Sequence, residues 1–236
     1  MTSGPDPAFP TLVIDTASQQ TVIGLGMAEA DWTWCEDDRE SGISLFEGVA
    51  GLLKSRETPL GRLVTVVFCE GPGSLLGIRT AAMALRVWVA GGFLPEVTLM
   101  TYSSLDLAGI EILRTSPEAS FTAAIDARRQ SWFCLTHPGQ PSGRPNIRRI
   151  PAAASDGIAG PVFLPEGFPV WNPRPESWRT CRYDPRLLES PGVRRQILRP
   201  IPQPDAFQLE APTYQKWTPA ISRVRPGTNR AEEVRP

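Results

Sequence analysis

Residues 63–90 read LVTVVFCEGPGSLLGIRTAAMALRVWVA and give the clearest indication of the fold class. The run at 63–69 is apolar at nearly every position and rich in β-branched residues, as in a central strand that is buried on both faces. Glycine and proline interrupt it at 71–73, and apolar residues then recur at helical spacing from Ile78 to Val89. A strand, a glycine-rich turn and a helix in succession are typical of an α/β protein.

The segments on either side extend this alternation of strands and helices. The order is β-β-β-α-β-α-β-α, followed by a hairpin. The predicted strands lie at residues 11–15, 21–27, 31–36, 63–69, 97–100, 121–126 and 131–136, and the predicted helices at 41–56, 78–89 and 104–114.

The charge of the chain is unevenly distributed. The formal net charge is only −1, so the overall charge indicates no nucleic-acid or membrane partner. Residues 138–204, however, contain 10 Arg, no Lys and 5 acidic residues. A solvated, arginine-rich surface is the favoured interpretation. The alternative is a surface that faces phosphate, because a guanidinium group suits phosphate oxygens.

The second half differs from the first in its proline content, since 18 of the 25 prolines lie beyond residue 137. We expect short strands and ordered loops there. The four cysteines lie far apart and indicate neither a disulfide framework nor a metal site. Residues 223–236 are polar and are expected to be a disordered tail. No signal peptide or membrane-spanning run is visible, so a cytoplasmic location is expected.

Three local motifs are candidate sites, and each has two interpretations. The glycine-rich loop that starts at Glu70 could be a structural turn, which is favoured, or an anion-binding nest at a helix N-terminus. Asp15, followed by Thr16, could cap its own turn or hold a magnesium-bound phosphate. The segment at Asp126 could be a hairpin turn with a solvated arginine pair, or Asp126 could anchor the turn while the arginines face phosphate or a partner carboxylate. The loop residues are Glu70, Gly71, Pro72, Gly73, Ser74, Gly77 and Arg79, and the arginines are Arg128 and Arg129.

His137 is the only histidine in the chain, and it precedes a Pro-Gly pair. We expect it to be a solvated loop residue. A single histidine cannot supply a zinc-ligand pair, and no catalytic triad can be assembled around it.

Five motifs in order carry a resemblance to a known family: LVIDTAS (12–18), EGPGSLLGIRTAAMALRVWVA (70–90), TYSSLDLAG (101–109), AAIDARRQSWF (123–133) and APTYQKW (211–217). Together they resemble the TsaB (YeaZ) family, the partner of TsaD in making threonylcarbamoyladenosine on tRNA. The resemblance implies the actin/Hsp70-like ATPase (ASKHA) fold, with two related lobes of mixed sheets and flanking helices. The first lobe would span 11–115, joined by a returning segment near 206–222, and a reduced second lobe would span 116–205.

The resemblance also implies that this chain is a scaffold without catalytic residues, metal or a cofactor of its own. Ser104 and Ala108 stand where TsaD carries a metal-binding pair of histidines. The implied partners are a TsaD-type catalytic subunit, a TsaE-type ATPase and, indirectly, tRNA; no membrane partner is implied. ATP or ADP would bind, if at all, at the interface of the complex.

The same resemblance places the partner interface on the first two helices, which would pair with a second copy of the chain when TsaD is absent. These residues could instead form the core, because one side of each helix must be buried. The interface candidates are Leu45, Phe46, Val49, Leu53, Ile78, Ala82, Leu85, Arg86 and Val89.

The alternative function is that of a free-standing ATP-dependent phosphotransferase or acyl transferase of the same fold. Asp15 and Asp126 would then flank a magnesium nucleotide, one from each lobe. The residues after Asp126 disfavour this, because Ala127 and the two arginines cannot bring the backbone as close to a phosphate as glycines would.

Overall fold

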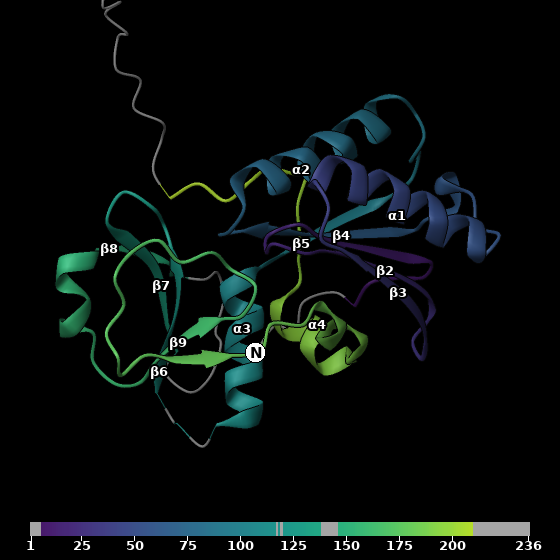
Figure 1. The fold of residues 1–236 in the computed structure, drawn as a ribbon. Helices are drawn as coiled ribbons and strands as arrows, with labels where there is room; N and C mark the ends of the chain where they lie inside the picture. Colours follow the sequence, from purple (N-terminus) through teal and green to yellow (C-terminus); the bar gives the residue numbers. More distant parts are fainter. Residues whose placement is uncertain (1–5, 117, 119, 138–145, 210–236) are drawn as a thin grey trace, which may run out of the picture.

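The chain forms two mixed β-sheets with helices between them and over the first sheet (Figure 1). The computed structural model describes residues 6–116, 118, 120–137 and 146–209. The elements are β1 (Thr11–Asp15), β2 (Thr21–Ala28), β3 (Asp31–Asp37), α1 (Ser41–Ser55), η1 (Leu60–Arg62), β4 (Thr65–Gly71), α2 (Leu75–Ala90), β5 (Thr98–Ser103), α3 (Ser104–Thr115), β6 (Phe121–Asp126), β7 (Ser131–His137), β8 (Arg148–Pro151), η2 (Ala152–Gly157), β9 (Val162–Pro165), β10 (Arg179–Cys181), η3 (Pro185–Glu189), α4 (Pro191–Ile197) and β11 (Arg199–Pro200).

The first sheet has the strand order β11-β5-β4-β1-β2-β3. The β1-β2-β3 meander is antiparallel, whereas β4 lies parallel to both β1 and β5. Parallel neighbours need crossover connections, and α1 and α2 lie side by side on one face of this sheet (Figure 1). The predicted order of strands and helices in the first half is confirmed.

The second sheet repeats the topology of the first. Its order, β8-β7-β6-β9-β10, matches β3-β2-β1-β4-β5 in sequence order and in strand direction. The short η2 replaces α1, and the residues between β9 and β10, all of which the structure describes, contain no helix. The prediction of two related lobes with a reduced second lobe is therefore confirmed.

Helix α3 joins the two lobes. It lies between the sheets (Figure 1) and packs against β4 and β5 on one side and β6 and β7 on the other. Most of its residues are buried, and one hydrophobic core continues through it from the first lobe into the second. A smaller cluster around Trp132 and Trp178 fills the opposite face of the second sheet. The lobes therefore share most of their apolar core.

The chain returns to the first lobe before its described end. β11 pairs with β5, and the Phe207 N–H donates to the Glu70 carbonyl oxygen at 2.7 Å. The return thus begins at Arg199, which corrects the second-lobe boundary expected at residue 205. Residues 210–222, including the APTYQKW motif, and the predicted tail at 223–236 lie outside the described residues.

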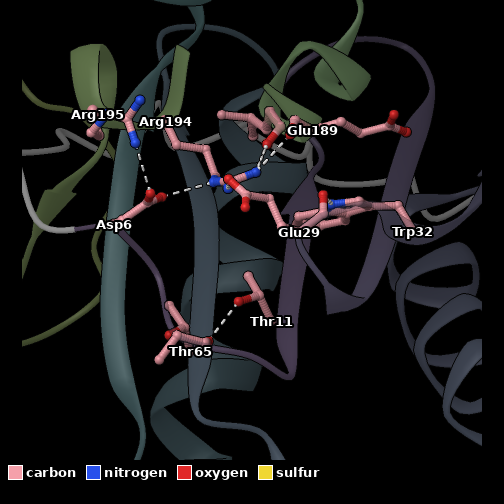
Figure 2. Close-up of polar contacts among 10 residues, drawn as sticks. Asp6, Thr11, Glu29, Trp32, Thr65, Glu189, Arg194 and Arg195 are labelled. Atoms are coloured by element: carbon pink, nitrogen blue, oxygen red, sulfur yellow. Dashed lines mark hydrogen bonds and ion pairs between the residues drawn. The ribbon is translucent and has the colours of Figure 1, made fainter. Parts of the chain in front are cut away.

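Arg194 on α4, just before this returning segment, contacts Asp6 near the beginning of the chain (Figure 2). It is 1% exposed. Its Nε donates to the Asp6 carboxylate at 3.0 Å, and its Nη1 donates to the carbonyl oxygens of Leu188 and Glu189 at 3.0 and 2.7 Å. The guanidinium carbon also lies 5.9 Å from the Trp32 ring centroid. The buried guanidinium group thus donates hydrogen bonds to one carboxylate and to two carbonyl oxygens.

None of the described helices is long and apolar enough to span a bilayer.

Candidate functional site

Asp15 ends β1 at the junction of the two lobes, where it is fully buried. Its carboxylate accepts hydrogen bonds from the Tyr102 hydroxyl at 2.5 Å, the Tyr183 hydroxyl at 2.6 Å and the Ala17 N–H at 2.9 Å. Burial raises the pKa of this carboxyl, which these hydrogen bonds oppose. Because tyrosines from both lobes occupy the carboxylate, these residues do not fit a magnesium-bound phosphate, and the turn-capping interpretation is confirmed.

The glycine-rich loop before α2 packs directly on the Asp15 turn. The Ser74 N–H donates to the Ala17 carbonyl oxygen at 2.7 Å, and the Ser74 hydroxyl caps α2 by accepting from the Gly77 N–H at 3.4 Å. A Cβ at Gly73 would lie 2.2 Å from the Ala17 carbonyl oxygen, and one at Gly77 would lie 2.5 Å from the Thr16 carbonyl oxygen. Glycine is needed here for the close approach of two backbones. The structure supports the structural-turn interpretation of this loop.

We expect Gly73→Ala to lower the free energy of unfolding by about 2 kcal/mol, because the clashing atom belongs to the backbone and cannot rotate away. Thermal unfolding followed by circular dichroism measures the change. Gly51→Ala is the matched control, since nothing lies within 4 Å of a Cβ there and alanine favours a helix. Equal stability of the two variants would contradict this account of the loop.

Asp126 occupies the equivalent place in the second lobe, at the end of β6. Its carboxylate accepts from the backbone N–H groups of Arg128, Trp171 and Asn172, each at 2.7 Å. The prediction that Asp126 anchors the hairpin turn is confirmed. Arg128 and Arg129 are exposed, and the guanidinium carbon of Arg128 lies 4.3 Å from the Trp171 ring centroid. Trp171 was not predicted as a site residue, because its contact with the turn comes from a distant, proline-rich segment.

A second group of charged side chains, partly or fully buried, lies around Glu70 of β4. Glu70 forms an ion pair with Arg199 of β11. Asp106, in the first turn of α3, is almost fully buried, and this burial raises its pKa to about 7. Arg199 opposes the shift and Glu70 adds to it. Sequence reasoning missed this group, because the order of the chain does not show that β11 returns beside β5.

His137 is not the solvated loop residue that the sequence predicted. It ends β7, is almost fully buried, and stacks on Phe121 with ring centroids 4.8 Å apart. A Cβ at Gly109 of α3 would lie 2.2 Å from its Nε2, so the helix leaves space for the ring only because glycine faces it. Burial lowers the pKa of His137 to about 4. The reason for the error is that α3, not the neighbouring Pro-Gly pair, determines the surroundings of this side chain.

The helices α1 and α2 bury most of the residues predicted for the interface. Five of the nine candidates belong to the core, which corrects their assignment to a surface. Arg86 is partly buried and donates to the Pro204 carbonyl oxygen at 2.8 Å. Phe46 and Val89 are exposed, Leu53 is half-buried, and Arg79 is exposed. The five core residues are Leu45, Val49, Ile78, Ala82 and Leu85.

An exposed apolar face nevertheless covers these two helices. Eight of the twelve large hydrophobic residues that are exposed in the described chain lie on α1, on α2 or just after α2. Met83 and Val87 are 53% and 57% exposed, and they are spaced one helical turn apart on α2. Phe46 of α1 packs edge-on against Trp88 of α2 at 6.1 Å, which makes the surface continuous across both helices. We call this surface the helical face; its members are Ile43, Phe46, Leu76, Met83 and Val87.

The described residues contain no group of three or more His, Cys, Asp or Glu side chains placed to hold a metal ion. Of the features above, the helical face is the one that offers unpartnered contact surface. Exposed apolar patches of this kind are typical of protein–protein interaction sites.

The fold is similar to that of two solved structures from Pseudomonas aeruginosa. One is YeaZ, with 19% identity over 78% of this chain and 91% of that chain and a TM-score of 0.56. The other is an uncharacterized protein with similarity to peptidase YeaZ, with 20% identity over 73% of this chain and 86% of that chain and a TM-score of 0.52. No protein-family model matches the sequence, and no curated protein matches it. The likeness confirms the predicted fold class.

Proposed function

We propose that this chain is a non-catalytic partner subunit of the TsaB (YeaZ) type, which binds and stabilises a TsaD-type catalytic subunit. In the cytoplasm the pair, with a TsaE-type ATPase, would make threonylcarbamoyladenosine on tRNA. The observation that carries this proposal is the helical face, because a contiguous exposed apolar surface often marks a protein–protein interaction site. The YeaZ-like fold and the motifs that resemble the family support the choice of partner.

The alternative, a free-standing phosphotransferase, has less support. Asp15 and Asp126 would have to hold the magnesium nucleotide, yet both carboxylates already accept three hydrogen bonds from the chain itself. A peptidase activity has less support still, because the single histidine is buried beside Phe121 and has a lowered pKa. Nucleotide would therefore be bound mainly by the partner subunits.

Co-expression with the TsaD-type protein of the same genome tests the proposal. We expect the two chains to co-purify, and we expect Met83→Arg or Val87→Arg to weaken the complex by about 30-fold or more, as burial of an unpaired charge in an apolar interface does. Isothermal titration calorimetry gives the dissociation constants. Substitution of Val49 or Leu85 would not test the interface, because both lie in the core.

Val64→Arg is the matched control, because Val64 is an exposed valine of the first lobe outside α1 and α2. It should leave the complex unchanged, and all variants should keep the far-ultraviolet circular dichroism of the parent. A complex that tolerates Val87→Arg would place the interface elsewhere. A parent chain that does not bind the TsaD-type protein and hydrolyses ATP by itself would support the phosphotransferase instead.

A further inference from the structure

The second lobe carries a surface that the proposed partner interface does not use. At the turn between β6 and β7, Arg128 and Arg129 project into solvent, and Arg149 lies beside them on the edge strand β8. Trp171, which is 56% exposed, stacks with Arg128. We call these four residues the Arg–Trp patch.

Hydrogen bonds hold the Arg–Trp patch in one arrangement. The Asp126 carboxylate accepts from the N–H groups of Arg128 and Trp171, which joins the turn to the Trp171 loop. The Ser131 hydroxyl donates to the Arg128 carbonyl oxygen at 2.8 Å and accepts from the Arg149 Nε at 2.8 Å. The buried side chains of Asp126 and Ser131 thus link three residues of the patch, and Arg129 lies next to them in the turn.

The backbone of this turn is unusual. Arg128, Arg129 and Gln130 have φ angles of 57°, 48° and 55°, which places three consecutive non-glycine residues in the left-handed region. Such residues are uncommon singly and persist where the surrounding hydrogen bonds fix them. Here the strained turn directs two arginine side chains outward from one short segment.

The arginines of the patch form no ion pair with the described residues. Ten arginines of the described chain form ion pairs, but Arg128, Arg129 and Arg149 pair with no acidic side chain that the structure describes. Asp126 is buried beneath them, and three backbone N–H groups satisfy it. The guanidinium groups therefore remain available for an anionic ligand.

The combination of residue types indicates the class of ligand. Guanidinium groups bind phosphate oxygens through charge-assisted hydrogen bonds. The Trp171 indole remains 56% exposed beside Arg128 and offers a platform on which an unpaired base stacks, which is the usual way in which proteins hold single-stranded RNA. An acidic protein segment would also bind the arginines, but it would make no use of the exposed ring.

We infer that the Arg–Trp patch binds an unpaired segment of RNA, with its phosphates on the arginines and a base on Trp171. The choice of RNA over DNA rests on the proposed function, in which tRNA is the substrate of the complex. The patch would give this subunit a direct contact with tRNA, in addition to its contact with the catalytic subunit.

The experiment is fluorescence anisotropy of a labelled RNA hairpin that carries a tRNA anticodon loop, titrated with the purified full chain. With three phosphate contacts, a plot of the logarithm of the association constant against the logarithm of the salt concentration should fall with a slope of about 2. The association constant should therefore drop about 15-fold between roughly 50 and 200 mM salt. Arg128→Gln and Arg129→Gln should each reduce the slope by about 0.7. Trp171→Ala should weaken binding by about 5- to 150-fold at an unchanged slope, and Trp171→Phe should restore most of the loss.

Arg62→Gln is the control, because Arg62 is an exposed arginine of the first lobe without an ion pair to the described residues. Absence of RNA binding at low salt, or an effect of Arg62→Gln equal to that of the patch variants, would overturn the inference. So would stronger competition by a poly-glutamate peptide than by unlabelled RNA, which would indicate an acidic protein ligand. Because co-purification with the catalytic subunit is measured separately, failure of RNA binding and failure of the proposed function are distinguishable.

Discussion

Replacement of Arg194 by methionine is expected to lower the free energy of unfolding by about 3 kcal/mol. Methionine keeps most of the packing against Trp32, so the loss comes from polar contacts. The carbonyl oxygens of Leu188 and Glu189 would lose their donor, and Asp6 would lose one of its two arginine partners. Urea unfolding, followed by tryptophan fluorescence, gives the free energy.

Arg195→Met is the control for this experiment. Arg195 contacts the same Asp6 carboxylate at 3.1 Å, but its side chain is 48% exposed. An exposed ion pair of this kind contributes about 0–1 kcal/mol. Similar losses in the two variants would mean that the burial of Arg194 has no energetic importance.

The second large effect is a pair of opposing pH dependences. Asp106 has a pKa of about 7 in the folded chain, above its ordinary 3.8, so the folded state holds a proton that the unfolded state releases. Stability from this group is therefore lost as the pH rises from about 4 to 7. His137 has a pKa of about 4, below its ordinary 6.5, so its contribution is lost as the pH falls from about 6.5 to 4. The two slopes nearly cancel in the parent chain.

Single substitutions should uncover each slope. Between about pH 4.5 and 6.5 the free energy of unfolding of Asp106→Asn should rise by about 3 kcal/mol more than that of the parent. Each pKa unit corresponds to about 1.4 kcal/mol, and this interval covers about two pH units between the ordinary and the raised pKa. His137→Gln should show a change of similar size in the opposite direction. Asp15, whose pKa is also raised, contributes equally to all three chains and cancels in the differences. Urea unfolding across this pH range measures the slopes, and a variant whose curve runs parallel to that of the parent would refute the assignment for its residue.

The sequence predicted the elements of the first lobe well but not the outward faces of its helices. Helical periodicity detects the apolar stripe that faces the core, and it therefore selected Leu45, Val49 and Leu85. Met83 and Val87 lie outside this stripe, so the periodicity of a single sequence does not single them out. A pattern that finds the core cannot by itself identify a second apolar surface on the same helix.

The contacts that satisfy the two strand-ending aspartates were beyond prediction for a different reason. Tyr183 reaches Asp15 across 168 positions of sequence, and Trp171 reaches Asp126 across 45. Both come from the proline-rich region, where regular hydrogen-bonding patterns are short and periodicity carries little information. The sequence showed that each lobe has a strand ending in aspartate, but not which groups donate hydrogen bonds to the carboxylates.

The core that continues through α3 has a consequence for the motions of the molecule. Enzymes that close around a ligand rely on hinges, where few contacts cross between rigid bodies. Here the lobes are fastened by the Tyr183–Asp15 hydrogen bond, by the Gln19 N–H to Gly167 carbonyl bond at 2.8 Å, and by a helix buried on both sides. We therefore expect no opening and closing of one lobe against the other. A subunit of fixed shape loses little conformational freedom on association, which suits the partner role proposed above.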